Sequence, residues 1–148
     1  MVRIPVRAAT VLDLVAVEAI YAGEVRQHTA SFEIESPDLA EIKQRWADVC
    51  NVGLPYLVAH LEGGVAGYAY AVPYRARSAY CYTVEDSVYV ARWARQRGVG
   101  LALLRALLSG CEIWGARQMV AIVGDPAANN ASIRLHEKVG FRSVGTLV

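Results

Sequence analysis

The stretch that decides the fold is residues 84–100, which read VEDSVYVARWARQRGVG. Its first seven residues are rich in β-branched and aromatic side chains, which is typical of a strand. Two glycines near its end predict a turn, and residues 101–108, LALLRALL, are mostly strong helix formers. A strand, a glycine turn and a helix in this order direct backbone N–H groups and the positive end of the helix toward an anion. The sequence therefore predicts an anion site at the turn, where Arg95 and Arg97 add positive charge.

The spacing of residues around the turn restricts which anion it holds. A P-loop requires Lys and then Ser or Thr after its last glycine, whereas Leu101 and Ala102 follow Gly100 here. The dinucleotide fingerprint requires a third glycine, and Leu103 stands at that position. What remains, from Arg95 to Gly100, is the pattern R-x-x-G-x-G. This pattern resembles the pyrophosphate loop of the GCN5-related N-acetyltransferases (the GNAT family), which bind acetyl-CoA. An ordinary strand-to-helix turn gives the same short pattern.

Composition limits the classes of protein that fit the chain. A length of 148 residues, with 55% hydrophobic and 20% charged residues, favours one domain spanning 1–148 with a substantial core. The formal net charge of +1, with no basic run, argues against nucleic acid as the partner. No apolar run is long enough to span a bilayer, and no secretion signal is apparent. The scattered cysteines, Cys50, Cys81 and Cys111, indicate reduced thiols in a cytoplasmic protein rather than disulfides or a metal site.

Periodicity and turn residues predict the order of the elements. Thr10 and Asp13 form a plausible capping pair at the start of a helix, and Ser36 followed by Pro37 predicts the start of another. The Gly63-Gly64 pair predicts a hairpin. A mixed sheet covered by helices, of class α+β or loosely α/β, is therefore expected. The predicted strands are 4–8, 55–61, 65–72, 84–90, 117–123 and 141–148, and the predicted helices are 10–26, one beginning at 36, one after Gly100, and 131–138.

Four segments carry a resemblance that covers nearly the whole chain, residues 20–21 and 29–32 included. They are VAGYA at 65–69, YRARSAY at 74–80, TVEDSVYV at 83–90 and NNASIRLHEKVGF at 129–141. Together and in this order they look like the phosphinothricin N-acetyltransferase branch of the GNAT family, which also acetylates methionine sulfoximine and methionine sulfone. The resemblance implies a sheet in which two parallel strands splay apart to admit acetyl-CoA. Family members continue past Val148 with a loop and a final strand, so we expect either a shortened chain or an edge covered by a second subunit in a homodimer.

The resemblance also implies which residues contact acetyl-CoA. The backbone of the splayed strand pairs with the pantetheine arm, the amides of the glycine turn hold the pyrophosphate, and Asn129 contacts the cofactor where the strands part. Unpaired N–H and C=O groups on a splayed strand need partners, and a pantetheine arm carries amides that suit them. The predicted cofactor residues are Val88, Tyr89, Val90, Arg95, Gln96, Arg97, Gly98, Val99, Gly100, Leu101 and Asn129, and no metal is expected.

Acetyl transfer to an amine needs a base, because an ammonium group must first lose a proton. Glu85 is the candidate, since partial burial in the strand is expected to raise its pKa; a surface carboxylate paired with an arginine is the alternative. Asp86 is expected on the opposite face unless a bulge intervenes. The N–H of Val88 is the candidate to stabilise charge on the thioester carbonyl. The resemblance implies an acid for the leaving thiolate at the position of His136, where many family members have Tyr; a packing role for His136, or departure of the thiolate without an acid, is the alternative.

Arg75 and Arg77 precede the central strand, and a guanidinium suits the carboxylate or phosphinate of an amino-acid analogue. The alternative is a solvated loop. Phe32 either lines the substrate pocket or packs into the hydrophobic core and anchors its loop. The predicted function is transfer of the acetyl group of acetyl-CoA to a small amino acid or analogue. The alternatives are a different amine (a protein N-terminus, a polyamine or an antibiotic) and a non-catalytic acyl-CoA-binding module. The predicted substrate residues are Phe32, Arg75, Arg77, Tyr80, Glu85, Asp86 and Ser87.

Overall fold

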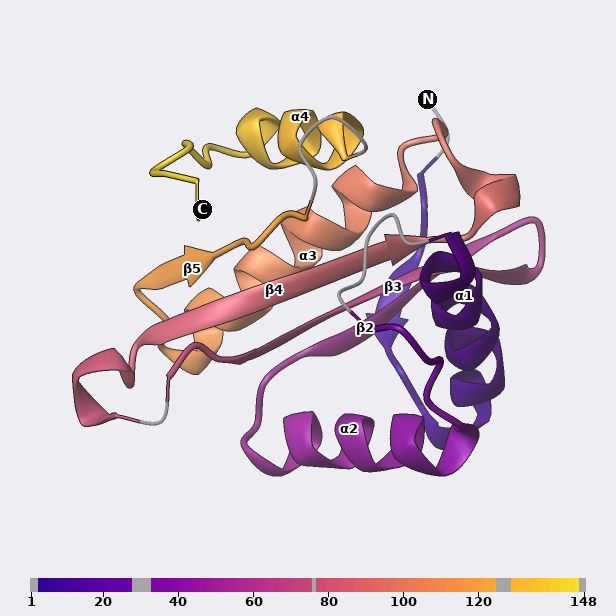
Figure 1. Ribbon diagram of the computed structural model, residues 1–148, viewed down its shortest axis with the longest axis horizontal. Helices are drawn as coiled ribbons and strands as arrows, with labels where there is room; N and C mark the ends of the chain where they lie inside the picture. The colour runs from indigo at the N-terminus through magenta and orange to yellow at the C-terminus, as the bar shows by residue number, and fades with distance from the viewer. Residues whose placement is uncertain (1–2, 28–32, 76, 125–128, 147–148) are drawn as a thin grey trace.

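The computed structural model describes residues 3–27, 33–75, 77–124 and 129–146, which form a five-stranded mixed sheet with helices packed on it (Figure 1). Neighbouring strands from β1 to β4 are antiparallel, and β5 runs parallel to β4. The predicted mixed sheet is confirmed. The strands, in both chain and spatial order, are β1 (Val6–Ala8), β2 (Tyr56–Leu61), β3 (Gly64–Pro73), β4 (Thr83–Val90) and β5 (Gln118–Val120). The α-helices are α1 (Leu14–Gln27), α2 (Leu39–Asn51), α3 (Val99–Trp114) and α4 (Asn130–Lys138).

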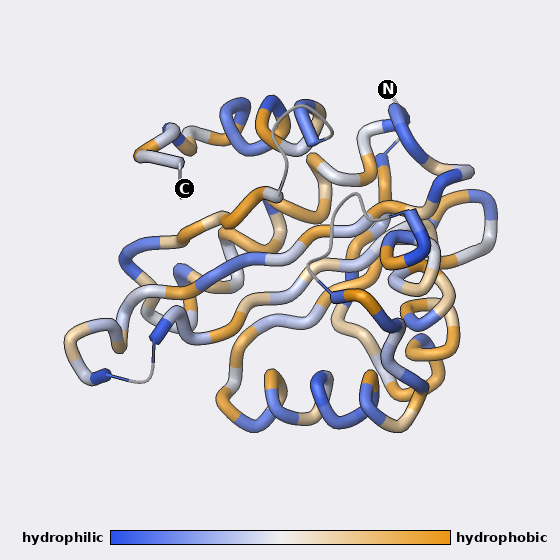
Figure 2. Tube along the Cα trace, in the orientation of Figure 1, coloured by the Kyte–Doolittle hydropathy of each residue, from blue (hydrophilic) through white to orange (hydrophobic). Residues whose placement is uncertain are grey.

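Helices cover both faces of the sheet. Alternation along β3 sends Tyr68 and Tyr70 toward α1 and α2, and it turns Gly67 toward α3. Figure 1 shows α3 passing behind β4, and Figure 2 shows hydrophobic and hydrophilic residues alternating around α2. Burial of the apolar faces between these layers forms the core. Its fully buried side chains include Leu14, Val17, Val58, Tyr68, Val84, Leu103 and Leu107.

Gly67 sets how closely β3, β4 and α3 approach one another. A Cβ atom at this position would lie 2.7 Å from the carbonyl oxygen of Tyr89 and about as near the side chains of Leu103 and Val99, at 3.0 and 3.1 Å. Only glycine fits such a backbone approach without displacing β4. The close packing holds the last part of β4 against α3.

Asp13 and Asp38 make capping hydrogen bonds at the starts of the first two helices. The predicted capping pair is confirmed, since the backbone N–H of Thr10 donates to Asp13 at 2.7 Å ahead of α1. The predicted start of α2 at Ser36 was wrong. The carboxylate of Asp38 accepts the N–H of Glu41 at 2.9 Å, and Asp38 caps the helix. A helix starts where a side-chain oxygen can accept the unpaired N–H three residues further on, and here the carboxylate of Asp38 does so for Glu41.

The two parallel strands pair over a short distance and then part. Thr83, Val84 and Glu85 of β4 lie opposite Gln118, Met119 and Val120 of β5. Beyond Glu85, β4 continues to Val90 and, among the described residues, pairs with β3 alone. The predicted splay of two parallel strands is therefore confirmed, and the strand predicted at 117–123 ends at Val120 because its ladder partner diverges.

The strand predicted at 141–148 was wrong for its described part. Residues 141–146 adopt no strand, and residues 142–146 are exposed. Apolar residues alone do not make a strand where no neighbouring strand offers hydrogen bonds, and none lies beside these residues in the part of the chain that the structure describes. Residues 147–148 lie outside that part. No helix over the described ranges has both the length and the apolar character needed to cross a bilayer.

Candidate active site

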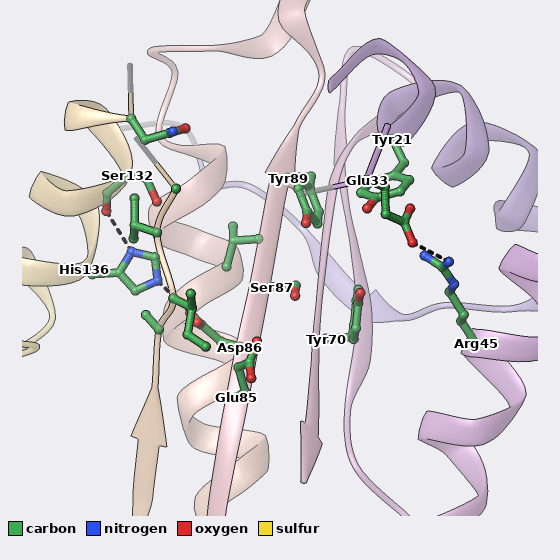
Figure 3. Close-up of a pocket in the computed structure, with 16 residues that line it drawn as sticks. Tyr21, Glu33, Arg45, Tyr70, Glu85, Asp86, Ser87, Tyr89, Ser132 and His136 are labelled. Atoms are coloured by element: carbon green, nitrogen blue, oxygen red, sulfur yellow. Dashed lines mark hydrogen bonds and ion pairs between the residues drawn. The ribbon is translucent and has the colours of Figure 1, made fainter. Parts of the chain in front are cut away.

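A cavity of about 260 Å³ lies where β4 and β5 diverge. Residues 85–89 of β4 run through the middle of the cavity. On one side of them lie α4 and the residues after β5, and on the other side lie residues of α1, α2 and β3 and the segment before α2 (Figure 3). Seven residues predicted from the sequence meet here, from positions up to 51 residues apart. They are Glu85, Asp86, Ser87, Val88, Tyr89, Asn129 and His136.

Glu85 and Asp86 leave β4 on opposite faces, because its register with β3 has no shift that would signal a bulge. The predicted alternation therefore holds. Both carboxylates nevertheless line the cavity, since the cavity wraps around the free edge of β4 and reaches both faces. Asp86 points toward His136, whereas Glu85 lies on the side of Tyr70 (Figure 3).

The half-buried carboxyl group of Glu85 has a raised pKa, as predicted. Burial raises this pKa most, the positive charge of Arg75 lowers it, and the negative charge of Asp86 raises it again. A carboxylate with a raised pKa holds a proton more readily near neutral pH, which is the property that a general base requires.

Asp86 and His136 form a buried pair between β4 and α4. His136 Nε2 lies 2.6 Å from Asp86 Oδ2, and Nδ1 lies 2.7 Å from the carbonyl oxygen of Ser132. Both oxygens are acceptors, so the arrangement suits a doubly protonated imidazole that donates to each. Burial alone would lower the pKa of His136, but the hydrogen bond and charge of Asp86 outweigh it and raise this pKa.

This pairing bears on the predicted acid role of His136. With both ring nitrogens engaged, the imidazole has to release Asp86 before Nε2 can donate to another group. In the observed arrangement His136 holds α4 against β4, which fits the packing alternative, and the acid role stays a prediction.

Polar side chains from α1, α2 and β3 form the other side of the cavity. Arg45 donates to Glu33 at 2.6 Å and to Glu41 at 3.1 Å. Tyr21 also hydrogen-bonds Glu33. Burial raises the pKa of Tyr70, so this hydroxyl stays protonated. Sequence reasoning missed these residues because they come from four separate segments with no shared motif.

Ser87 links this side to β4. Its hydroxyl lies close enough to Tyr70 and Tyr89 to lower the pKa of each, against the larger effect of burial, which raises both. Behind Tyr70, the rings of Tyr56, Tyr68 and Tyr70 stack within 8° of parallel, with centroids 4.9–6.3 Å apart. The one available signal in the sequence was the alternation of Tyr68 and Tyr70 along β3, which puts both rings on one face.

The glycine turn begins α3 as predicted. Gly98 adopts φ +87° and Gln96 φ +62°. The first helical hydrogen bond runs from the N–H of Ala102 to the carbonyl of Gly98, at 3.1 Å. The N–H groups of residues 99–101 precede that bond and are therefore available to an anion. At Gly100 a Cβ would lie 3.0 Å from Leu135, so glycine here lets α4 approach the turn.

The two arginines of the turn are paired with carboxylates. Arg95 donates to the buried Glu24 of α1, and Arg97 donates to Glu62 of the β2–β3 hairpin at 2.7 Å. These pairs tie the turn to the rest of the protein. Among the described residues, the N–H groups of 99–101 are therefore the donors of the turn without a partner, and they fit the pyrophosphate of acetyl-CoA.

Three predicted substrate residues do not line the cavity. Arg75 lies over the ring of Tyr74, 4.1 Å from its centroid, and donates to its hydroxyl and carbonyl oxygens. Tyr80 packs edge-on against Tyr74, and Arg77 is exposed. Arg75 remains close enough to influence the pKa of Glu85. Phe32 lies outside the described residues, and the roles of all four stay predictions.

The splayed parallel pair beside a helix start that is open to anions is the arrangement expected of an acetyltransferase. Residues 17–141 match the Acetyltransferase (GNAT) family, and the chain belongs to this family. The enzyme class and fold predicted from the sequence are therefore confirmed.

Relatives of known activity lie within the predicted branch of this family. The chain is 52% identical over 135 residues to phosphinothricin N-acetyltransferase of Alcaligenes faecalis, covering 91% of this chain and 68% of that protein. It is 38% identical over 144 residues to an L-methionine sulfoximine/L-methionine sulfone acetyltransferase of Pseudomonas paraeruginosa, covering 96% and 82%. The crystal structure of a Sinorhizobium meliloti phosphinothricin acetyltransferase in complex with AcCoA matches with a TM-score of 0.91 at 40% identity, covering 96% and 76%.

Proposed function

We propose that this chain transfers the acetyl group of acetyl-CoA to the amino group of a small amino acid or amino-acid analogue, as its phosphinothricin and methionine sulfone relatives do. The observation that carries the proposal is the cavity at the split, where Glu85 has a raised pKa beside the open edge of β4. A base at the edge where the cofactor is expected to enter is what N-acetylation requires.

Acetyl-CoA supplies the acetyl group as a reactive thioester when it is bound. The N–H groups of residues 99–101 would hold its pyrophosphate, and the open edge of β4 from Val88 to Val90 would meet its pantetheine arm. These backbone groups need hydrogen-bond partners, and the cofactor carries matching ones.

The side chains of the cavity divide the remaining work. Glu85 accepts the proton that the acceptor's ammonium group loses, directly or through a water molecule. The N–H of Val88 is directed at the developing negative charge of the carbonyl. Asp86 and His136 keep α4 against β4, which fixes the side of the split opposite the acceptor.

Release of free thiol from acetyl-CoA tests the proposal. We expect thiol release with L-methionine sulfone or phosphinothricin as acceptor, and formation of the N-acetyl product by mass spectrometry. If calorimetry shows that acetyl-CoA binds but no thiol is released with any amine as acceptor, the chain is instead a binding module. Thiol release only with a peptide N-terminus, a polyamine or an aminoglycoside would move the enzyme to another acceptor class.

The assembly and location of the enzyme are part of the same proposal. The three free cysteines suit a reducing compartment such as the cytoplasm. Leu12 and Val15, 87% and 63% exposed beside one another on the first helical turns, suit an interface between two copies. Light scattering at several concentrations is expected to give the mass of a homodimer.

A further inference from the structure

The side of the cavity opposite His136 is built from ionised and hydroxyl groups. We call this set the polar wall and define it as Tyr21, Glu33, Arg45 and Tyr70, which all line the cavity. Figure 3 shows Tyr21, Glu33 and Arg45 across β4 from His136, with Glu85 and Ser87 between the two sides. An acceptor whose amino group lies at Glu85 therefore meets the polar wall with another part of its structure.

The ion pairs of the polar wall are fixed before any acceptor arrives. Arg45 Nη2 donates to Glu33 at 2.6 Å, and Nε donates to Glu41 at 3.1 Å. Both partners of the Arg45–Glu33 pair keep about a third of their side-chain surface exposed. Burial would raise the pKa of Glu33, but the hydrogen bonds from Arg45 and Tyr21 outweigh it and lower that pKa. Glu33 is accordingly ionised at neutral pH.

The charges around the cavity leave no spare cation for an anionic group. The single positive charge of Arg45 faces the two carboxylates of Glu33 and Glu41, and that of His136 faces Asp86. Glu85 adds a further negative charge whenever it is ionised. Among the cavity-lining residues that the structure describes, every cation is therefore already paired.

A hydrogen-bond donor, in contrast, remains available. The two bonds of Arg45 leave its Nη1 amino group uncommitted among the described residues. The hydroxyl of Tyr70 lies beside Ser87 and stays protonated because burial raises its pKa. A neutral group with strong acceptor oxygens can use such a donor at little electrostatic cost, whereas an anion has to approach Glu33.

Resting on the proposed function, we propose that the polar wall binds the end of the acceptor's side chain, and that it selects neutral polar ends over anionic ones. Sulfone, sulfoximine and carboxamide groups belong to the favoured class. Phosphinate and carboxylate groups belong to the disfavoured class. Glu33 is the residue that sets this preference, and Arg75 and Arg77, outside the cavity, are left for the acceptor's own carboxylate.

The test compares kcat/KM for two acceptors of similar length at saturating acetyl-CoA. L-methionine sulfone has a neutral side-chain end and phosphinothricin an anionic one. We expect methionine sulfone to be favoured on the order of tenfold, the effect of one screened like charge at short range. In Glu33→Gln, kcat/KM for phosphinothricin should rise until the preference is lost. Glu112→Gln, the same change on the exposed surface of α3, should leave the ratio as in the wild type.

A second pair of acceptors needs no variant. L-glutamine and L-glutamate differ at the side-chain end in the same way, so glutamine is expected to be the better acceptor. Melting temperature and acetyl-CoA affinity establish that Glu33→Gln is folded. An equal or reversed preference in the wild type for either pair would overturn the inference, and so would an unchanged ratio in a folded Glu33→Gln. Absence of thiol release with every amino acid would overturn the proposed function itself, and the inference with it.

Discussion

The first and second halves of β4 differ in how they are held. Residues 83–85 have a strand on each side, β3 and β5, whereas in the part of the chain that the structure describes residues 86–90 have β3 alone. The closed half is fixed by two hydrogen-bonded ladders. The open half has backbone groups that no strand of the described residues pairs with, beside the cavity where a ligand is proposed to bind. One strand thus combines a rigid anchor with a binding edge.

The two candidate acidic residues stand on either side of the boundary between these halves. Glu85 is the last residue opposite β5, and Asp86 is the first without a partner there. The base is therefore held by the closed half, which fixes its position, while its side chain reaches the cavity of the open half. Asp86, in contrast, is held by His136 across the gap.

Replacement of the base at the boundary should give the largest effect. In Glu85→Gln we expect kcat to fall about a hundredfold or more, because glutamine cannot accept the proton that the acceptor's ammonium group must lose. Acetyl-CoA affinity should not change, because the backbone groups proposed to bind the cofactor are unaffected by the substitution. Steady-state thiol release and calorimetry measure the two quantities, with Glu112→Gln as the matched control. Wild-type turnover in Glu85→Gln would remove Glu85 as the base.

Loss of the pair that spans the gap should cost stability. In Asp86→Ala the buried His136 loses its charge partner, and we expect the free energy of unfolding to drop by about 3 kcal/mol. Asp86→Asn keeps an oxygen acceptor and should lose less. Urea unfolding of the three proteins measures this order. Equal stability of wild type and Asp86→Ala would show that the gap holds its shape without the pair.

Contact between the open half and α3 depends on Gly67. In Gly67→Ala the new methyl group meets the carbonyl of Tyr89, so we expect a loss of about 2 kcal/mol in unfolding free energy as β4 shifts. Gly145→Ala is the control, because its Cβ would meet nothing within 4 Å. Thermal and urea unfolding compare them. Should Gly67→Ala unfold like the control, β4 is free to move away from α3.

The pairing of His136 should also make stability depend on pH. Its folded-state pKa is raised above 6.5, so the stabilisation is complete below 6.5 and is lost as the pH rises through the folded-state value. From pH 6.5 upward we expect unfolding free energy to fall by at most about 1.4 kcal/mol per pH unit, the effect of one proton. Asp86→Asn should show a weaker slope. An identical slope would assign the pH dependence to other groups.

The smallest effect is expected at the loop before the closed half. Arg75 and Arg77 are exposed, so their pull on an acceptor carboxylate is screened by solvent. In Arg77→Ala we expect the acceptor KM to rise about fivefold while kcat stays the same. Arg75→Ala should raise KM likewise, and it should also raise the pKa of Glu85, which the charge of Arg75 lowers. Arg142→Ala, also exposed, should leave KM unchanged. A KM that does not move in either loop variant would place the carboxylate elsewhere.

Local chemistry made several elements of the fold predictable. β-branched and aromatic residues predicted β4, the glycines of the turn predicted the start of α3, and the double glycine predicted the hairpin between β2 and β3. Each signal acts within a few residues, so it can be recognised without knowing the rest of the fold.

The open half depends on contacts between distant residues. The apolar run after Arg117 gives no sign that pairing stops at Val120, because divergence depends on where β4 and α4 lie. The family resemblance, and not the pattern of the run, predicted the splay. Likewise Arg45 and Glu33 meet only through the packing of α2 against α1 and β3, so nothing near either residue marks it as part of the cavity.

The stacked rings of Tyr56, Tyr68 and Tyr70 have a consequence for laboratory evolution of this enzyme. Because each ring rests on its neighbours, replacing one leaves a void that the others cannot fill, and compensating changes must come together. Arg45 and Glu33 are coupled through one ion pair, but both are partly exposed, so a change at either leaves no void in the core. Selection for new acceptors should therefore fix its first substitutions at Arg45 and Glu33 and change the stacked tyrosines last.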